Sequence, residues 1–386
     1  MNLQNLRFEP YEFPPHLQEF RGEVRRFLQK KCQEYSAVHL SNTWDAYDKE
    51  FSLALGAQGW LGMTLPKEYG GHGRTALERY IVVEELLAWG APSAHHWVAD
   101  RQSGQLISRY GTEEQKQTII PKITSGEACF AIGMSEPNAG SDLASLKTKA
   151  VRTADGWLVN GQKIWTSNAH RADYIIALFR TDSETDSRHM GLSQFLIDMK
   201  KTQGITCRPI KDLTGRSHFN EVFFEDALLP ADALVGNEGG GWKQVTEELA
   251  FERSGPERYL SCFILLRKLL DVLKDTDNPA LLARIGSQIA MVTALRNMSL
   301  SVAGMLNEGL DPGLQASVVK DMGCSFEQGL PGFAQEIVDL EPSLADSGAD
   351  YQQVLGNLIQ LAPSFSLRGG TPEIMRGIIA RGLGLR

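Results

Sequence analysis

The sequence predicts an α+β protein of several domains, with helical segments on either side of a middle region of short strands. Two changes of pattern support this prediction. Helical spacing of apolar residues gives way to short alternating segments near Ala128, and helix formers return after Glu238. A chain of 386 residues, 42% of them hydrophobic, can bury cores for two or three structural units. We therefore expect an N-terminal helical domain at 1–128, a β domain at 129–238 and a C-terminal helical domain at 239–386.

The N-terminal region contains two clear helix signals. Apolar residues recur at helical spacing among charged neighbours from Leu17 to Leu28, which predicts an amphipathic helix. Thr75 and Glu78 form a capping-box pattern for a second helix that runs to about Gly90. The glycine cluster within Lys67–Gly73 lacks the spacing of a phosphate-binding loop, so we interpret it as a turn before that helix.

The middle region reads as regular short strands. Asn160 and Gly161 predict a two-residue hairpin between the first two of them. Short strands with tight turns are typical of a compact antiparallel barrel or sandwich. The expected strands are Trp157–Val159, Gln162–Trp165, Tyr174–Phe179, Ser193–Ile197, Ile205–Ile210 and Asn220–Phe224.

The C-terminal region is rich in helix formers. Between Pro331 and Pro363, prolines and glycines interrupt the helical pattern, so loops are expected there. The expected helices are Lys243–Arg253, Tyr259–Leu273, Ala280–Glu308, Leu314–Gly329 and Pro372–Arg381.

Charge and composition exclude several classes of function. The formal net charge of −8 and the lack of a dense basic block argue against a nucleic-acid partner. With no long apolar run and no signal-like N-terminus, we expect a cytoplasmic protein that is not in a membrane. The five cysteines are widely spaced, which favours free thiols in a reducing compartment. His95 and His96 point about 100° apart on a helix, so we expect no metal site.

Two segments carry the pattern of a binding site for an aromatic, anionic ligand. An apolar strand, Phe130–Met134, runs into a polar loop that ends at Asp142 and contains Ser135, Gly140 and Ser141. Such a loop offers backbone N–H groups and hydroxyls at close range, which suits a phosphate or a flavin edge. The segment Lys163–Asn168 adds a tryptophan beside two hydroxyl residues, a flat apolar surface with donors at its rim.

These two segments resemble the acyl-CoA dehydrogenase family. Met134–Asp142, which reads MSEPNAGSD, is similar to the family's signature, and Ile164–Asn168, which reads IWTSN, is similar to its flavin-flanking strand. The similarity extends from about Trp60 to Arg253 and resumes at the C-terminus. It implies an N-terminal helical domain, a middle antiparallel β-barrel and a C-terminal helical bundle, with FAD as cofactor. It also implies transfer of a proton and a hydride out of an acyl-CoA thioester.

The resemblance leaves the usual base position without a side chain. Many members place a glutamate before a Gly-Thr pair near the C-terminus, and here that position is Gly369. A second arrangement in the family uses a Glu-Arg pair on a helix at the start of the last domain, which matches Glu252 and Arg253. We therefore predict that Glu252 is the catalytic base. Arg253 could hold Glu252 ionised, contact the CoA moiety or form a structural ion pair.

The resemblance also assigns the other site residues. Thr371 would cap a helix whose positive end faces a polar group, or would serve as a cap alone. The substrate would contact Ser141, Arg253 and Gly369. The residues expected to contact the cofactor are Ile132, Met134, Ser135, Gly140, Ser141, Trp165, Thr166, Ser167, Thr371 and Glu373.

Two departures from the family pattern concern the adenosine half of FAD. The places of its two binding motifs read Asp275–Leu282 and Val354–Ile359, and neither motif is present. These losses and Gly369 resemble a divergent branch that processes bulky branched or cyclic acyl chains, such as steroid side chains. Some members of that branch pair with a different subunit. We expect a homo- or hetero-oligomer, dimeric or tetrameric, with an electron-transferring flavoprotein as the electron acceptor.

Two other readings stay open. The chain could be a flavin-poor partner subunit of a heteromeric dehydrogenase, which the lost adenosine motifs favour. It could also be a flavin monooxygenase or a carrier-protein-linked oxidase on the same scaffold. A monooxygenase would not need an α-proton base, so the activity of a Glu252 variant separates it from a dehydrogenase.

Overall fold

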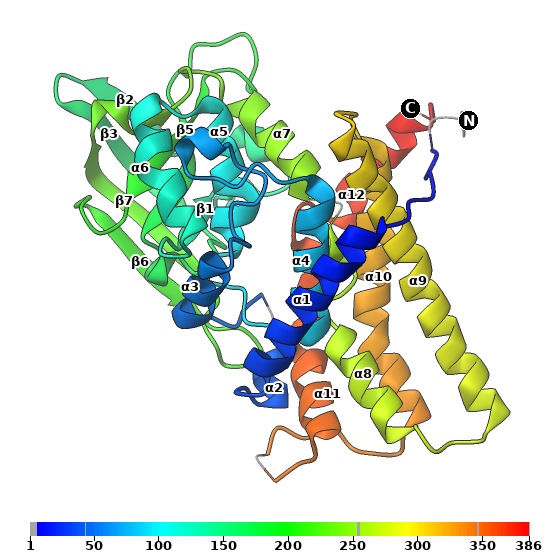
Figure 1. Ribbon diagram of the computed structural model, residues 1–386. Coiled ribbons are helices and arrows are strands. Elements are labelled where there is room, and N and C mark those ends of the chain that lie inside the picture. Colours follow the sequence, from blue (N-terminus) through cyan, green and yellow to red (C-terminus); the bar gives the residue numbers. More distant parts are fainter. Residues whose placement is uncertain (1–5, 43, 253–254, 346, 386) are drawn as a thin grey trace. The chain divides into compact units, whose positions relative to one another are not determined.

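The computed structural model describes residues 6–42, 44–252, 255–345 and 347–385, without the side chains of 249–252. The chain divides into two compact units. Unit 1 comprises Met1–Ala46, Thr75–Ser93 and Glu252–Arg386, and unit 2 comprises Tyr47–Arg74 and Ala94–Phe251. The predicted fold class is confirmed: N-terminal helices, a middle sheet and C-terminal helices follow one another along the chain (Figure 1). The division at Ala128 and Glu238 stays a prediction.

Unit 2 is built on an eight-stranded sheet. Its strands follow the order β6-β7-β3-β2-β4-β5-β8, and β1 pairs with β4. The sheet is mixed rather than purely antiparallel, because β4 pairs in parallel with both β1 and β2. Strands β2 and β3 lie between β1 and β4 in the sequence. The strands are β1 (Phe130–Gly133), β2 (Lys149–Thr153), β3 (Gly156–Lys163), β4 (Tyr174–Arg180), β5 (Leu192–Asp198), β6 (Ile205–Ile210), β7 (Phe219–Leu229) and β8 (Leu234–Val235).

The expected hairpin at Asn160-Gly161 is wrong. Both residues lie inside β3, which continues to Lys163 with a register shift against β7 between Val159 and Gly161. Asn160 bonds across to Asp226 instead of turning the chain. Gly161 is needed for close packing, since a Cβ there would lie 2.6 Å from Oγ1 of Thr148. The pattern marked a bulge, which Asn-Gly also suits.

Apolar residues from helices of unit 2 cover part of the sheet. Leu106, Ile119 and Ile123 form one cluster with Phe130 and Ile176 of the sheet. A second apolar cluster, which contains Trp157 and Phe224, covers the other face of the sheet. The helices of unit 2 are α3 (Lys49–Ala57), α5 (Gly104–Tyr110), α6 (Glu113–Thr124) and α7 (Gly241–Glu252), with a π-helical turn at Ala99–Ser103 before α5. The last residue of α7, Glu252, is counted in unit 1.

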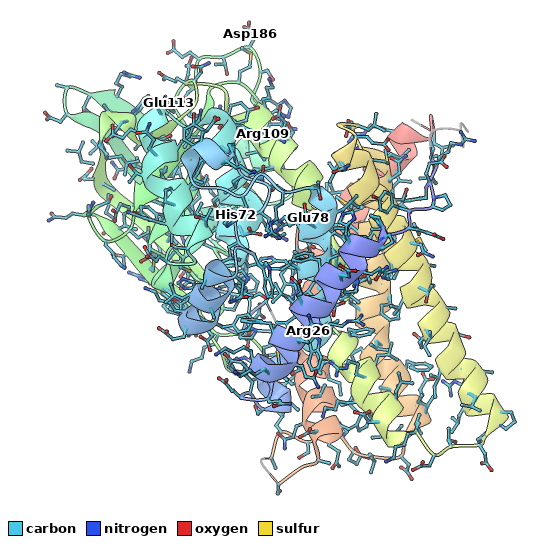
Figure 2. All side chains as sticks on the ribbon, in the orientation of Figure 1. Arg26, His72, Glu78, Arg109, Glu113 and Asp186 are labelled. Carbon is cyan, nitrogen blue, oxygen red and sulfur yellow. The ribbon has the colours of Figure 1, made fainter. Side chains whose placement is uncertain are left out.

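Unit 1 consists of helices. The predicted capping box is confirmed, because Thr75 and Glu78 exchange hydrogen bonds at the start of α4. Glu78 is labelled in Figure 2. The amphipathic helix from Leu17 is also confirmed and packs its apolar face on α4 and α9. The helices are α1 (Pro15–Cys32), α2 (Ala37–Ser41), α4 (Ala76–Trp89), α8 (Phe263–Val272), α9 (Pro279–Asn307), α10 (Gly313–Ile337), α11 (Asp350–Leu361) and α12 (Pro372–Gly382).

The expectation of loops from Pro331 to Pro363 is wrong for most of that stretch. Helix α10 continues through Pro331 to Ile337, and α11 contains Gly356. Proline removes the N–H that would bond the carbonyl four residues earlier. That carbonyl belongs to Glu327, and the thiol of Cys262 donates to it at 3.3 Å. A buried thiol from a neighbouring segment thus replaces the missing backbone donor.

One helix within the described residues, α9, has the length and hydropathy of a membrane span. In an 18-residue window, 39% of it is buried inside the structure. Core helices of globular proteins share these properties, so the observation is weak evidence for a membrane.

Candidate functional site

The predicted polar loop begins with a tight turn at the end of β1. Backbone N–H groups of Glu136 and Ala139 donate to each other's carbonyl oxygens at 2.9 and 3.0 Å, which reverses the chain. Gly140 and Ser141 follow in exposed positions. A Cβ on Gly140 would meet no atom within 4 Å, so no described protein group demands glycine there. The bare backbone leaves space for a ligand to approach.

A buried ion pair fixes the base of this loop to the end of β3. The Lys163 ammonium, fully buried, lies 2.8 Å from Oε1 of Glu136 and 3.1 Å from the carbonyl oxygen of Met134. Ile164 N donates to Ser135 O at 2.9 Å. The two segments that the sequence singled out are therefore in direct contact.

The environment of this pair shifts both ionisations. Burial lowers the pKa of the Lys163 ammonium to about 8, and Glu136 partly offsets the effect. Burial also raises the pKa of the Glu136 carboxyl, but the charge of Lys163 and hydrogen bonds from Lys163, Thr148 and Lys147 leave that pKa below its ordinary value. Both side chains are charged at neutral pH, and they hold the loop rigid.

In the turn after β3, the side chain of Trp165 is exposed and the hydroxyl of Thr166 is buried. Trp165 has a positive φ of 60° and is 57% exposed. A left-handed backbone costs such a residue about 1–2 kcal/mol, and strain of this kind clusters at functional sites. Thr166 is buried, and its Oγ1 has no hydrogen-bond partner within the described part of the chain. An exposed aromatic face beside an unpaired buried hydroxyl fits an aromatic ligand with a polar edge.

Asn220 holds this turn against β7, a role that the sequence did not reveal. Its backbone oxygen accepts from Thr166 N at 3.1 Å, and its Nδ2 donates to Thr166 O at 3.0 Å. The side chain is fully buried. Only a structure could show this, because β3 and β7 are paired strands that lie far apart in the sequence.

Helix α7 packs beside the polar loop. Val245 and Trp242 of α7 belong to one apolar cluster with Met134 and Ala139 of the loop segment. The helix ends at Glu252, the predicted base. The side chain of Glu252 and the whole of Arg253 lie outside the described residues, so their predicted roles stay predictions.

The C-terminal group of predicted residues lies in unit 1. Gly369 and Gly370 have positive φ angles of 67° and 100°, and the buried Lys320 ammonium donates to the carbonyl oxygen of Gly370. Thr371 is the N-cap residue of α12, as expected, but its hydroxyl makes no capping bond. It bonds Glu373 instead, which lowers the pKa of that carboxyl.

A cluster of charged side chains lies beneath this glycine turn. The guanidinium carbon of Arg368 is 3.7 Å from the centre of the Trp44 ring and 4.3 Å from that of Phe365. Glu327 of α10 is fully buried and accepts from Ser261 N at 2.6 Å. Burial raises the pKa of Glu327 to about 7.

The predicted residues thus form two groups. Within unit 2 the structure brings together Ile132, Met134 and Ser135, which are half-buried, the exposed Gly140 and Ser141, and the turn Trp165–Ser167. Thr371 and Glu373 are in contact in unit 1, beside Gly369. His95 and His96 have separate partners: His95 contacts Tyr47 and the Gly126 carbonyl, and His96 contacts Ser52. Among the described residues, no group of three or more His, Cys, Asp or Glu side chains is arranged to hold a metal ion.

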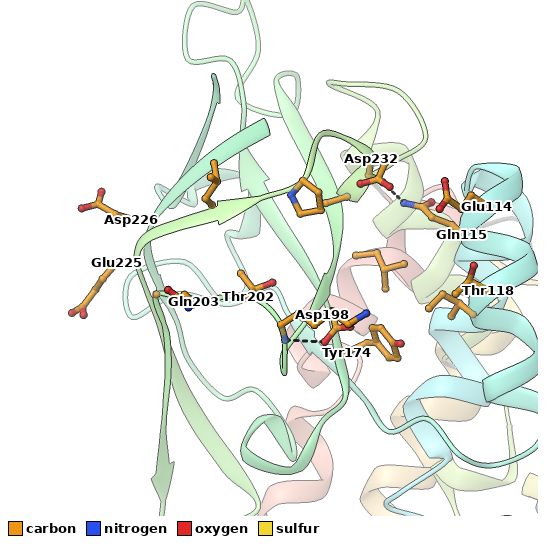
Figure 3. A pocket seen from close by; sticks show the side chains of 17 residues that line it. Glu114, Gln115, Thr118, Tyr174, Asp198, Thr202, Gln203, Glu225, Asp226 and Asp232 are labelled. Carbon is orange, nitrogen blue, oxygen red and sulfur yellow. Dashed lines mark hydrogen bonds and ion pairs between the residues drawn. The ribbon is translucent and has the colours of Figure 1, made fainter. Parts of the chain in front are cut away.

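A separate pocket of about 750 Å³ lies in unit 2, between α6 and the ends of β5 and β7 (Figure 3). Several acidic side chains line the pocket. Nε2 of Gln115, which belongs to α6, donates to the Asp232 carbonyl oxygen at 2.7 Å. None of the residues predicted for cofactor or substrate lines it. The acidic side chains that line it are Glu114, Asp198, Glu225, Asp226 and Asp232.

The order of helices, sheet and helices, with a polar loop held beside an exposed tryptophan, is the arrangement expected of an acyl-CoA dehydrogenase. Residues 14–127 match the family model described as "Acyl-CoA dehydrogenase, N-terminal domain", and residues 131–227 match "Acyl-CoA dehydrogenase, middle domain". The chain belongs to the acyl-CoA dehydrogenase family. It is therefore an oxidoreductase that acts on the CH–CH bond of acyl-CoA thioesters.

Curated relatives include several proteins of Mycobacterium tuberculosis. The chain is 31% identical to the acyl-CoA dehydrogenase FadE26 over 95% of its own length and 96% of that protein. It is 30% identical to the acyl-CoA dehydrogenase IpdE1, over 96% and 98% of the two chains. A third relative, the acyl-CoA dehydrogenase FadE34, is 34% identical over 87% of this chain, but the match covers only 46% of that protein.

Solved structures show the same fold. A structure titled "Tcur3481-Tcur3483 steroid ACAD" is similar with a TM-score of 0.86 and 28% identity, over 97% of this chain and 98% of that one. The ChsE4-ChsE5 complex from Mycobacterium tuberculosis is similar with a TM-score of 0.83 and 28% identity, over 98% of this chain and all of that one.

Proposed function

We propose that the protein binds FAD and catalyses α,β-dehydrogenation of an acyl-CoA thioester, with Glu252 as the base. The observation that carries the FAD assignment is the turn at Trp165 and Thr166. A strained, exposed indole beside a buried hydroxyl without a described partner fits a flat cofactor with a polar edge. The open backbone at Gly140 and Ser141 fits an anionic group.

Each residue would contribute one physical effect. Ile132, Met134 and Trp165 would hold the ring system flat, and the Thr166 hydroxyl would donate to its polar edge. Ser135 and Ser167 would donate at the rim, while Gly140 and Ser141 would face the pyrophosphate or the acyl-CoA. Thr371 and Glu373 match family positions that touch the cofactor. The chemistry that bound FAD would supply at this site is acceptance of the hydride from the β-carbon.

Glu252 would take the proton from the carbon next to the thioester carbonyl. The support is its place in the chain: it is the last residue of α7, whose earlier turns pack on Met134 and Ala139. The usual base position, Gly369, has no side chain to accept a proton. Arg253 and Gly369 are proposed to contact substrate, because Arg253 follows Glu252 in the chain and Gly369 occupies the family's usual base position.

A panel of acyl-CoAs tests the proposal directly. The purified protein should be yellow, and a substrate should bleach it under anaerobic conditions. Useful probes are butyryl-CoA, isovaleryl-CoA and a steroid side-chain CoA thioester. A protein that carries flavin but is bleached by none of them would contradict the proposed activity for these acyl classes.

Thr166→Val tests the cofactor site by a readout other than turnover. Loss of one hydrogen bond of about 1 kcal/mol should weaken flavin binding roughly fivefold and shift the flavin absorption spectrum. Thr166→Ser should preserve both. An unchanged spectrum and affinity in the valine variant would remove Thr166 from the cofactor site.

A second candidate is a partner subunit that binds little flavin alone. The segment that replaces one adenosine motif, Val354–Ile359, lies inside α11, where Val354, Leu355 and Leu358 are buried in the helical core. Relatives in solved structures are titled as two-component assemblies. We propose that the chain forms an oligomer, with an electron-transferring flavoprotein as acceptor. The two candidates differ in flavin content. An enzyme that binds FAD alone is yellow when purified by itself, whereas a flavin-poor partner subunit is yellow only after co-expression with a homologous subunit.

A further inference from the structure

Helix α7 contacts the sheet through buried polar groups as well as through apolar side chains. Gln194 of β5 is fully buried, and its Nε2 donates to Oε2 of Glu248 at 3.1 Å. Glu248 is itself only 6% exposed. One turn earlier, Nε2 of Gln244 donates to the Val235 carbonyl at 2.8 Å. Val235 is the register partner of Gln194 across β5 and β8.

The start of α7 is fixed at the same place. A Cβ on Gly241, its first residue, would lie 2.7 Å from the Leu192 carbonyl oxygen, so the helix begins in close contact with β5. Contacts at Gly241, Gln244 and Glu248 therefore define the depth and the rotation of the helix along the sheet.

Glu252 continues the row of Gln244 and Glu248. Residues four apart share one side of an α-helix, and each step of four advances about 6 Å along the axis. Glu252 ends the helix four residues after Glu248. The carboxyl–amide bond at Glu248 is thus the last described polar contact between α7 and the sheet before Glu252.

Burial of the Gln194 and Glu248 side chains costs the folded protein free energy. A buried carboxylate is costly unless it is well paired. The Gln194 oxygen atom Oε1 has no partner within the described residues, which adds to that cost. Apolar residues of similar volume would pack there at less cost. Costly buried polar groups that fix a catalytic segment are typical of the layer that supports a site.

We propose that Gln194 and Glu248 are positioning residues for the base: their buried hydrogen bond sets the rotation of the last turn of α7, and with it the place of Glu252. This inference rests on the proposed role of Glu252. Without the bond, the Glu248 carboxylate loses its donor from β5, and the sheet holds the last turn of α7 less firmly. The end of the helix then loses its fixed rotation.

The test uses the full-length holoenzyme and the acyl-CoA that bleaches it fastest among the three named probes. Gln194→Met should lower the rate of flavin bleaching about 30-fold, with KM changed less than threefold and flavin content unchanged, because a misplaced base slows proton removal without altering binding. Glu248→Gln should give a smaller loss. The exchanged pair, Gln194→Glu with Glu248→Gln, restores a carboxyl–amide bond and should recover most of the rate.

Gln115→Met is the matched control. Gln115 is also a buried glutamine of unit 2, and its amide donates from α6 to the carbonyl oxygens of Asp232 and Leu234 rather than to a residue of α7. Its variant should lose comparable stability but keep the bleaching rate. The proposal fails if Gln194→Met bleaches within twofold of the native enzyme, if both glutamine variants slow equally, or if the exchanged pair shows no recovery.

Glu252→Gln separates this inference from the proposed function. A bleaching rate close to native in that variant removes the base assignment and the positioning role with it. A slow Glu252→Gln enzyme together with unaffected Gln194 and Glu248 variants overturns the positioning role alone.

Discussion

At the scale of single residues, the site depends on a few side chains in costly states. Lys163 and Glu136 are charged and buried, Trp165 has a left-handed backbone, and the Thr166 hydroxyl is buried without a described partner. Each costs free energy in the protein alone. Such costs are expected where the missing contact comes from a ligand.

The backbone conformation at Gly369 restricts which residues this position can hold. With φ at 67°, followed by Gly370 at 100°, the turn suits glycine and disfavours other residues by about 1–2 kcal/mol. We therefore predict that Gly369→Glu does not create a working base. In a Glu252→Gln background, the added glutamate should leave the flavin-bleaching rate as slow as in the single variant. Recovery to within tenfold of native would show that the turn adapts to a side chain.

At the scale of elements, local patterns predicted most helices and strands correctly. The capping box at Thr75 and Glu78 fixed the start of α4, and alternation located β4, β5 and β6. The errors have physical causes. Asn160-Gly161 marks a bulge because Thr148 packs against Gly161, and Pro331 does not end α10 because Cys262 bonds the carbonyl that proline leaves unpaired. Both causes are tertiary contacts that a local pattern does not contain.

The Cys262 contact can be measured by a double-mutant cycle. Cys262→Ala should lower the free energy of unfolding by about 1–2 kcal/mol, because the Glu327 carbonyl loses its donor. In a Pro331→Ala background, the new backbone N–H can bond that carbonyl, so the cost of Cys262→Ala should fall by about 0.5–1 kcal/mol. Urea denaturation of the four proteins gives the coupling. Strictly additive effects would contradict the account.

The sequence identified the two segments of the candidate site, and the structure adds the contacts between them. It identified Ser135, Gly140, Trp165 and Thr166, and the structure shows that their segments touch. It did not reveal the Glu136–Lys163 pair, although both residues stand in the motifs, because their contact depends on how β1 and β3 are placed in the sheet. Gln194 and Asn220 carry no local signal at all.

At the scale of the whole molecule, buried ionisable groups make stability depend on pH. Glu327 has a pKa raised by burial to about 7, against 4.5 in the unfolded chain. Between these values the folded protein binds more protons than the unfolded chain, so stability falls as pH rises from about 4.5 to about 7. The loss is on the order of 3 kcal/mol at most.

Glu327→Gln should remove this contribution. The difference in free energy of unfolding between variant and native protein should therefore change in favour of the variant as pH rises from 5 to 8. Urea denaturation at several pH values provides the measurement. A constant difference across that range would show that Glu327 titrates alike in the folded and unfolded chain.

The proposed base, Glu252, lies at the end of α7, and Glu252→Gln removes its ability to accept a proton. We expect this variant to bind FAD as the native enzyme does but to be bleached by acyl-CoA at least about 1,000-fold more slowly, because no carboxylate takes the α-proton. Thr246→Ala, an exposed change on the same helix, should bleach at the native rate. A Glu252→Gln enzyme that bleaches within tenfold of the native rate would contradict the account.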